Sequence, residues 1–225
     1  LSPLSAHGGG ILLGTRGYER ATPPHHHPSR DVSPCRVPAR VRPILAAEYA
    51  ARYPAHVRGL VLISLPSYQS KAEAQAYIIE HGEWMARITV LNGGAAHSIH
   101  LLLATFRPLV TLLAGRLSHA IPAAVAEDSL AHTWHSYSGT LAHCVLSHNV
   151  LPALIALGAL PILALHGNAD PAAPLAAVQS LAAQVPTMTL HILPGKHHIF
   201  LTQHAACLAA IQSALTAMQS NAAGA

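Results

Sequence analysis

Aromatic and charged side chains are scarce in this sequence. Its 225 residues include two Phe, two Trp and six Tyr, and Asp, Glu, Lys and Arg together make up 10%. A protein that binds single-stranded nucleic acid needs aromatic rings on which bases can stack, and this chain has few. The formal charge is +4, and residues 1–60 hold eight Arg and no Lys. The six arginines from Arg16 to Arg42 are mixed with Pro and His in no helical pattern, so we expect no nucleic-acid partner.

Cysteines and long apolar runs are also scarce. The three cysteines, Cys35, Cys144 and Cys207, are far apart and form no CxxC pair. Isolated cysteines in odd number are typical of a reduced, cytoplasmic chain and do not fit a disulfide framework. The most apolar stretch, residues 150–165, is interrupted by two prolines and a glycine and is shorter than the ~20 residues that cross a bilayer. No signal-peptide pattern is visible at Leu1, so we expect a cytoplasmic protein without a membrane partner.

Histidine is abundant, with 18 residues, but the histidines do not form a metal-binding pattern. His25, His26 and His27 form a short run that His7 or Cys35 could extend, and such a run can hold a metal adventitiously. No set of three or four ligands has the spacing of a structural metal site. We therefore predict that the protein has no metal site.

Two segments have the pattern of a parallel α/β sheet. Residues 44–52 are rich in Ala and Leu and predict a helix that ends before Pro54. Residues 60–63 form a short apolar run, which is typical of a strand buried on both faces. The second segment predicts strands at 161–165 and 188–193 and helices at 175–184 and 205–218. Strands and helices that alternate at this spacing form βαβ units, so we predict an α/β fold with a mostly parallel sheet flanked by helices.

The segment between these two parts is mostly helix-forming. It contains no convincing strand, and its candidate helices are residues 72–88, 96–106, 109–117, 123–134 and 139–146. Roughly 90 residues are too many for an ordinary connection between strands, so we predict an inserted helical lid. Residues 1–43 are rich in Pro, Arg and His without periodicity, and we expect an irregular or truncated N-terminal part. The predicted organisation is an α/β core of residues 1–66 and 158–225, with a lid at residues 67–157.

Five stretches of sequence are informative together: HGGG (His7–Gly10), RGYERATPP (Arg16–Pro24), AEYAARYPAHVRGLVLISLP (Ala47–Pro66), PILALHGNADPAAP (Pro161–Pro174) and LPGKHHIFLTQHAACLAAI (Leu193–Ile211). The first two resemble the oxyanion loop and the RGYGRSTPP loop of the α/β-hydrolase superfamily. The third resembles the helix and strand that follow its nucleophile elbow. The last two resemble its catalytic-acid turn and its catalytic-histidine loop. The resemblance is to capped serine hydrolases of the esterase and peptidase type, and it is most specific over residues 44–66 and 161–211.

The resemblance implies roles for individual residues. Asp170 matches the acid position, in a turn just past an apolar run, where a carboxylate can fix the tautomer of an imidazole. Two neighbouring histidines match the base. His198 fits from both the upstream PG-x-x-H spacing and the downstream Gln-His pair, whereas His197 fits if the loop is one residue shorter, so His198 is preferred and His197 is the alternative. Gly8 and Gly9 match the turn whose backbone N–H groups would bind an oxyanion.

The sequence departs from the family at the nucleophile. The family has Gly-x-Ser-x-Gly on a tight turn between a strand and a helix, and here the serine position falls on Arg40. Pro38 and Arg42 stand where that turn needs glycines, and arginine has no nucleophilic form near neutral pH. Nearby residues of nucleophile type lie away from this turn: Ser5, Ser33 and Cys35. Because the chain is family-like from Ile44 onward, a reading-frame shift or a wrong splice upstream would explain the departure.

The resemblance implies an ancestral hydrolysis of an ester- or amide-type acyl bond in a small apolar substrate. The chemistry would be a Ser-His-Asp mechanism, which needs no cofactor. Members of a triad act as a unit, so without an assigned nucleophile we expect this chain to be weakly active or inactive. The alternative is a non-catalytic protein that binds a small molecule on the same fold.

Overall fold

The structure is a computed structural model, and it describes residues 11–13, 42–110 and 131–223. Within these ranges the chain forms a four-stranded sheet with the strand order β1-β2-β3-β4. The strands are β1 (Ile11–Leu13), β2 (Gly59–Ile63), β3 (Ile162–Gly167) and β4 (Met188–Leu193). β2, β3 and β4 are parallel, and β1 is antiparallel to β2. The prediction of an α/β fold with a mostly parallel sheet is confirmed.

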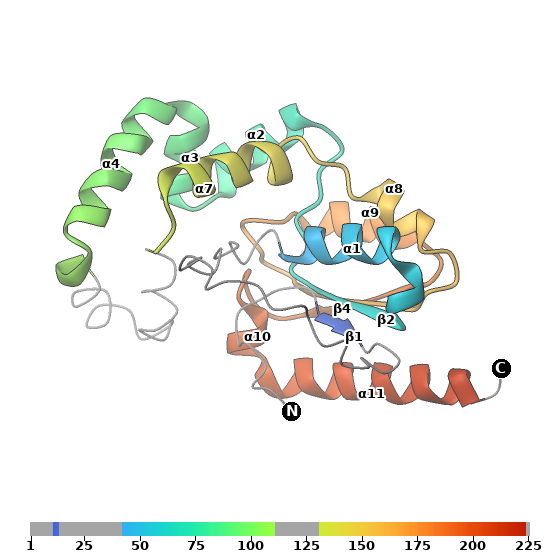
Figure 1. The fold of residues 1–225 in the computed structure, drawn as a ribbon. Helices are drawn as coiled ribbons and strands as arrows, with labels where there is room; N and C mark the ends of the chain where they lie inside the picture. The colour runs from blue at the N-terminus through green and yellow to red at the C-terminus, as the bar shows by residue number, and fades with distance from the viewer. Residues whose placement is uncertain (1–10, 14–41, 111–130, 224–225) are drawn as a thin grey trace, which may run out of the picture.

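Helices cover both faces of the sheet (Figure 1). The helices are α1 (Arg42–Arg52), η2 (Pro54–His56), α2 (Lys71–His81), α3 (Trp84–Leu91), α4 (Gly93–Thr105), α7 (Trp134–Thr140), η3 (Leu141–Val145), α8 (Leu151–Ala156), α9 (Leu175–Gln184), α10 (Ile199–Thr202) and α11 (His204–Ala223). α1, α8 and α9 pack on one face, and α10 and α11 pack on the other. This arrangement is the layered architecture that the alternating pattern of strands and helices predicts.

The apolar runs of β2 and β3 are explained by burial on both faces. Leu60 and Leu62 point toward α1, α8 and α9, whereas Val61 and Ile63 point toward α10 and α11. The side chains of β3 alternate between the same two faces, because Leu60 pairs with Ile162 and each later residue of β2 pairs with the next residue of β3. A fully buried side chain of this size contributes about 1.5–3 kcal/mol relative to an exposed one. These two strands therefore form the centre of the core.

The first strand differs from the prediction for the N-terminal part. The sequence predicts that residues 1–43 are irregular, but Ile11–Leu13 forms a strand whose residues pair with Val61, Leu60 and Gly59 of β2. Three apolar residues carry no periodicity of their own, so this strand exists through its pairing with β2. Among the described residues it occupies the edge of the sheet next to β2, in the antiparallel direction.

Between β2 and β3, the described residues of the segment predicted as a lid form α2, α3, α4, α7, η3 and α8. α2, α3, α4 and α7 lie to one side of the sheet (Figure 1), whereas α8 packs on the face of the sheet that α1 and α9 cover. α2 begins at a polar cap: Ser70 Oγ accepts from the Glu73 N–H at 3.1 Å, and Glu73 Oε2 accepts from the Gln69 N–H. The single helix predicted over residues 72–88 is wrong, because Gly82 in an extended conformation separates α2 from α3. The predicted helices at 109–117 and 123–134 fall largely outside the described residues.

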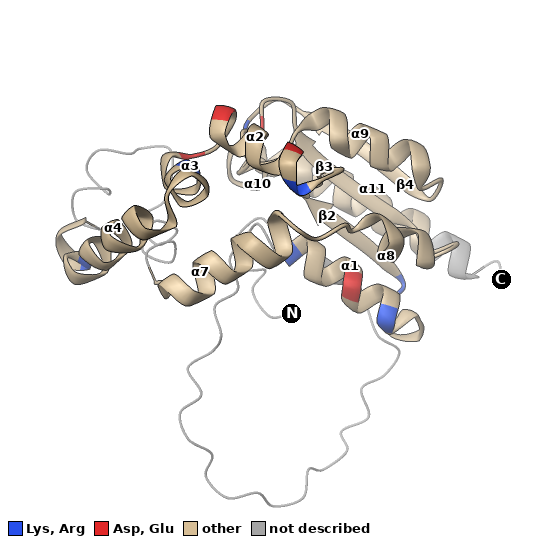
Figure 2. Cartoon of the chain, turned by 90° about the horizontal axis from the view of Figure 1, so that it is seen from above, with Lys and Arg blue, Asp and Glu red and all other residues tan. Residues whose placement is uncertain are grey.

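The helices between β2 and β3 have a small core of their own. It consists of Tyr68, Ala74, Ile78, Ala86, Leu141, Val145 and Leu146. The charged side chains of the described residues are few and dispersed over separate helices (Figure 2). In the described ranges, no helix is both long and apolar enough to cross a membrane.

Candidate active site

The candidate site lies where β2, β3 and β4 end. The carboxyl ends of parallel strands meet at one edge of a sheet, and ligands of open α/β sheets bind there. Ser64 follows β2, the turn of residues 168–174 follows β3, and the loop of residues 194–198 follows β4. The structure therefore brings together two of the predicted regions that lie 27 residues apart in sequence, the acid turn and the histidine loop.

Asp170 and His197 form a buried pair. The Nδ1 atom of His197 lies 2.9 Å from Oδ2 and 3.1 Å from Oδ1 of Asp170. The side chain of Asp170 is 0% exposed and that of His197 is 6% exposed. Oδ1 also accepts the N–H groups of Ala172 at 2.8 Å and Ala173 at 3.1 Å, which fixes the carboxylate within its own turn. With Nδ1–H donating to this carboxylate, Nε2 of the neutral imidazole is left as a proton acceptor.

The histidine that meets Asp170 is the alternative, not the preferred one. The loop after β4 is short, because Gly195 at φ +141° turns the chain and α10 begins at Ile199. His198 is half-buried at the N-cap of α10, and His197 is the loop residue whose ring reaches the carboxylate. The preference for His198 is therefore corrected in favour of His197 as the partner of Asp170.

Ser64 holds the backbone of the histidine loop. It is the only non-glycine residue of the described ranges with a positive φ, at 53°, and it is 2% exposed. Its hydroxyl donates to the carbonyl oxygen of His197 at 2.6 Å. Because the hydroxyl is bound to this backbone oxygen and not to the imidazole, the geometry gives Ser64 a structural contact rather than the place of a nucleophile.

The acid turn and the histidine loop are also joined directly. Asn168 Oδ1 accepts the N–H of Gly195 at 3.0 Å, and the N–H of Ala169 donates to the Gly195 carbonyl at 3.0 Å. A Cβ on Gly167 would lie 2.6 Å from the backbone oxygens of Gly195 and Lys196. Glycine at the end of β3 thus allows the histidine loop to approach the strand closely.

Two tyrosines and a second histidine hold the acid turn, and sequence reasoning missed all three. The Tyr68 hydroxyl donates to the Ala172 carbonyl at 2.7 Å, and the Tyr77 hydroxyl donates to the Asp170 carbonyl at 2.8 Å. His166, which is 1% exposed, places Nε2 at 3.0 Å from the Ala173 carbonyl. The only sequence signal for these contacts is the position of His166 inside the apolar run before the turn.

Burial sets the protonation of His166. It lowers the pKa of this imidazole below the ordinary 6.5, and the Asp170 carboxylate and the Ala173 hydrogen bond offset the shift in part. His166 is therefore neutral at pH 7, with Nε2–H donating to the carbonyl. Its Nδ1 atom is buried and has no hydrogen-bond partner among the described residues.

The other predicted site residues, Arg40, Gly8 and Gly9, lie outside the described residues. Within the described ranges, no residue hydrogen-bonds Nε2 of His197, and no group of three or more His, Cys, Asp or Glu side chains could hold a metal ion. The structure thus brings Asp170 and His197 together, and the roles of acid and base, like the nucleophile and the oxyanion turn, stay predictions.

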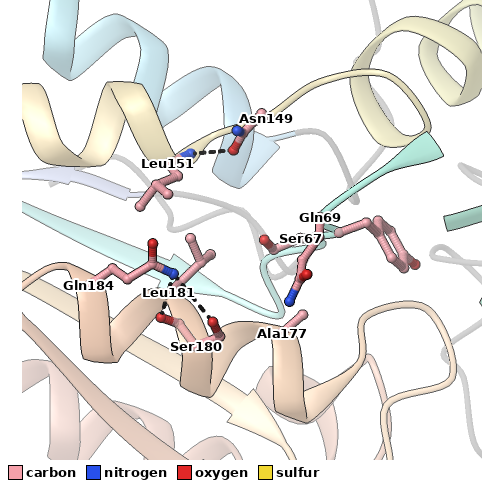
Figure 3. A pocket seen from close by; sticks show the side chains of 9 residues that line it. Ser67, Gln69, Asn149, Leu151, Ala177, Ser180, Leu181 and Gln184 are labelled. Carbon is pink, nitrogen blue, oxygen red and sulfur yellow. Dashed lines mark hydrogen bonds between the residues drawn. The ribbon is translucent and has the colours of Figure 1, made fainter. Parts of the chain in front are cut away.

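A pocket of about 330 Å³ lies between α9, the segment after β2 and the start of α8 (Figure 3). Ser67 and Gln69 line it from the segment after β2, and Ser180 and Gln184 line it from α9 on the opposite side. Asn149 lines it from the segment just before α8. Tyr68, whose hydroxyl holds the acid turn, also lines this pocket. The polar lining is uncharged, and the volume is in the range of pockets that hold small molecules.

Comparisons with known proteins agree with this architecture. A hydrolase from Pseudomonas aeruginosa PA01 is 19% identical with a TM-score of 0.53, and the match covers 77% of this chain and 61% of that one. A proline iminopeptidase from Mycobacterium smegmatis is 20% identical with a TM-score of 0.52, and the match covers 80% and 64%. A bacterial membrane phospholipase A is 19% identical with a TM-score of 0.50, and the match covers 79% and 55%. No protein-family model and no curated protein sequence matches the chain.

The fold and the site define a class of protein. It is an α/β protein whose parallel strands carry an acid and a histidine on the loops at their carboxyl edge. Its solved neighbours are hydrolases, and the chain has the α/β-hydrolase fold. The chain spans about three fifths of the length of the structures it matches, with 61% and 64% of the two bacterial enzymes named first.

Proposed function

We propose that this chain is an α/β-hydrolase-like protein in which Asp170 and His197 are the acid and the base of a Ser-His-Asp mechanism. The observation that carries the proposal is the buried pair itself, with Nδ1 at 2.9 Å from the carboxylate and Nε2 not hydrogen-bonded to any described residue. The ancestral reaction is hydrolysis of an ester- or amide-type bond in a small apolar molecule. Residues 67–157 are the proposed lid over that substrate.

Asp170 and His197 have different roles in this mechanism. Asp170 accepts the Nδ1–H of His197, holds the ring in one tautomer and stabilises the imidazolium that forms during the reaction. Nε2 takes the proton from the attacking hydroxyl and then gives it to the leaving group. Water repeats the cycle on the acyl-enzyme, and Nε2 again accepts its proton. No cofactor enters these steps.

The nucleophile limits the activity of this chain. The family position for the serine falls on Arg40, which cannot attack an acyl group. Without a nucleophile the pair can still act as a general base toward water, but triad members act as a unit and little of the rate remains. We therefore propose weak or absent hydrolytic activity.

A second candidate function is the binding of a small molecule without turnover. Two observations favour it: within the described ranges no Ser or Cys hydrogen-bonds Nε2 of His197, and the pocket beside Ser67 and Gln184 has the volume of a small-molecule site. The ligand would be uncharged, because the pocket is lined by neutral amide and hydroxyl groups and by Leu and Ala.

The adjacent histidines provide a matched control for the test. The full chain and its His197→Ala and His198→Ala variants are treated with a fluorophosphonate probe, which labels activated serines, and assayed on a short-chain ester. We expect His197→Ala to lower any labelling and turnover by about 10²-fold or more, the usual contribution of a general base. His198→Ala should retain both. Loss of activity in His198→Ala alone would assign the base to the other ring, and a wild-type chain that neither labels nor turns over would favour the binding function.

A further inference from the structure

The acid turn has little regular backbone structure and is held by side chains. Asp170 Oδ1 accepts the N–H groups of Ala172 and Ala173, and Pro171 has no N–H to donate. Three carbonyl groups of the turn each accept from a side chain: that of Asp170 from Tyr77, that of Ala172 from Tyr68, and that of Ala173 from His166. The position of the carboxylate therefore depends on these three donors.

The three donors come from different parts of the fold. His166 belongs to β3, so it moves with the sheet. Tyr68 and Tyr77 belong to the segment after β2, with their ring centroids 6.0 Å apart, and Tyr77 lies on α2. The polar cap at Ser70 fixes the start of α2, and its residues Ala74 and Ile78 pack in the core of the helical segment with Leu141.

We infer that Tyr77 is a positioning residue that links the helical segment between β2 and β3 to the Asp170–His197 pair. Its hydroxyl ties α2 to the carbonyl of Asp170 itself, at 2.8 Å. When the helical segment shifts, Tyr77 moves the residue whose carboxylate holds Nδ1 of His197. The inference rests on the proposed function only for the catalytic role of the Asp170–His197 pair. The hydrogen bond of Tyr77 itself can be measured without catalysis.

The phenol is suited to this contact over a wide pH range. Burial raises the pKa of Tyr77 above its ordinary 10.0, and the negative charge of Asp170 adds to the shift. The hydroxyl therefore stays protonated and remains a donor throughout the neutral range. The ring also packs on His81, with the centroids 4.7 Å apart, which limits its rotamers.

The test measures the hydrogen bond between His197 and Asp170 by proton NMR of the full chain. The reporter is the low-field Nδ1–H resonance of His197, assigned by its absence in His197→Ala. Tyr77→Phe removes one hydroxyl, and Tyr53→Phe is the matched control, because Tyr53 lies on the exposed side between α1 and η2. We expect Tyr77→Phe to shift this resonance and to speed its exchange with water about three- to tenfold, the change expected for one lost hydrogen bond. Tyr53→Phe should leave both unchanged.

A second variant tests the link to the helical segment and does not depend on Tyr77→Phe folding. Leu141→Ala loosens the core that holds α2, at a distance from the pair. It should also speed the exchange of the Nδ1–H in the wild-type background. Its effect should be smaller in the Tyr77→Phe background, where Tyr68 is the remaining residue of this core that donates to the turn. An unchanged resonance and exchange rate in both single variants would overturn the inference. That result would leave the proposed function intact, whereas a His197→Ala variant that keeps all of the wild-type labelling and turnover would overturn the function and not this contact.

Discussion

At the scale of single residues, the site is a set of buried polar groups. Asp170 has no exposed side-chain surface, yet its carboxylate receives two backbone N–H groups and the imidazole of His197. Burial of a carboxylate is costly unless such donors are present, so the turn and the carboxylate stabilise each other. His166, beside them, is a buried histidine whose pKa is lowered by its burial.

His166 predicts how stability depends on pH. Its folded-state pKa is lowered, so below about pH 6.5 the unfolded chain binds a proton that the folded chain does not. The free energy of unfolding should therefore fall as the pH drops from about 6.5 toward the folded-state pKa, by up to about 1.4 kcal/mol per pH unit. Urea unfolding at pH 7.5, 6.5 and 5.5 measures this slope.

The variant His166→Gln should flatten that slope, since Gln can donate to the Ala173 carbonyl and does not titrate. His135→Gln is the control, because His135 is exposed on α7, and its slope should match that of the wild type. A His166→Gln slope as steep as that of the wild type would show that another group is responsible for the pH dependence.

At the scale of elements, the site depends on how closely the loop after β4 approaches the end of β3. The two segments share the hydrogen bonds of Asn168 and Ala169 with Gly195, and Ser64 binds the carbonyl of His197 from the end of β2. Gly167 makes this approach possible, because any side chain there would meet backbone oxygens that cannot rotate away.

Gly167→Ala should therefore destabilise the protein by about 1–3 kcal/mol, the usual cost of overpacking a tight site. Gly139→Ala is the matched control, since a Cβ at Gly139 in α7 meets nothing within 4 Å. Alanine in that helix should be neutral or stabilise by up to about 1 kcal/mol. Urea unfolding of both variants checks this, and equal stabilities would contradict the close approach of the loop to β3.

The elements whose pattern is local could be predicted from the sequence. The helix at 175–184 and the strand at 188–193 have the predicted bounds as α9 and β4. A run rich in Ala and Leu defines the helix, and alternating apolar positions define the strand. β1 could not be predicted, since its three residues form a strand through pairing with β2. For the candidate site, the turn that contains Asp170 could be predicted from the sequence, because it follows an apolar run. The choice between His197 and His198 depended on where α10 begins, and the contacts of Ser64, Tyr68 and Tyr77 exist only in the folded chain.

At the scale of the whole molecule, α1 and β2 form a helix followed by a strand, which is the second half of a βαβ unit. A helix that precedes a strand of a parallel sheet normally follows a neighbouring parallel strand, joined by a right-handed crossover. β2 has β3 on one side, and among the described residues its other neighbour is β1, which is antiparallel. The strand that would lead into α1 in a βαβ unit is therefore not found in the described part of the sheet.

The same place in the sequence lacks the nucleophile turn, and one hypothesis explains both observations. If the coding DNA upstream of Ile44 is read in a shifted frame, the parallel strand and its serine turn are lost together, whereas everything from α1 onward keeps its pattern. We predict that the DNA of the source locus, translated in its other two frames just before the codon of Ile44, encodes Gly-x-Ser-x-Gly after a run of apolar residues.

A chain carrying that restored segment should gain a reactive serine, since position 40 precedes α1 in the sequence and the family's nucleophile turn precedes a helix in the same way. It should label stoichiometrically with a fluorophosphonate at that serine, and His197→Ala should abolish the labelling while His198→Ala retains it. If no frame encodes such a turn, the loss of the nucleophile is a property of the protein. The binding function then becomes the better account of why the buried Asp170–His197 pair persists in a fold that cannot complete its triad.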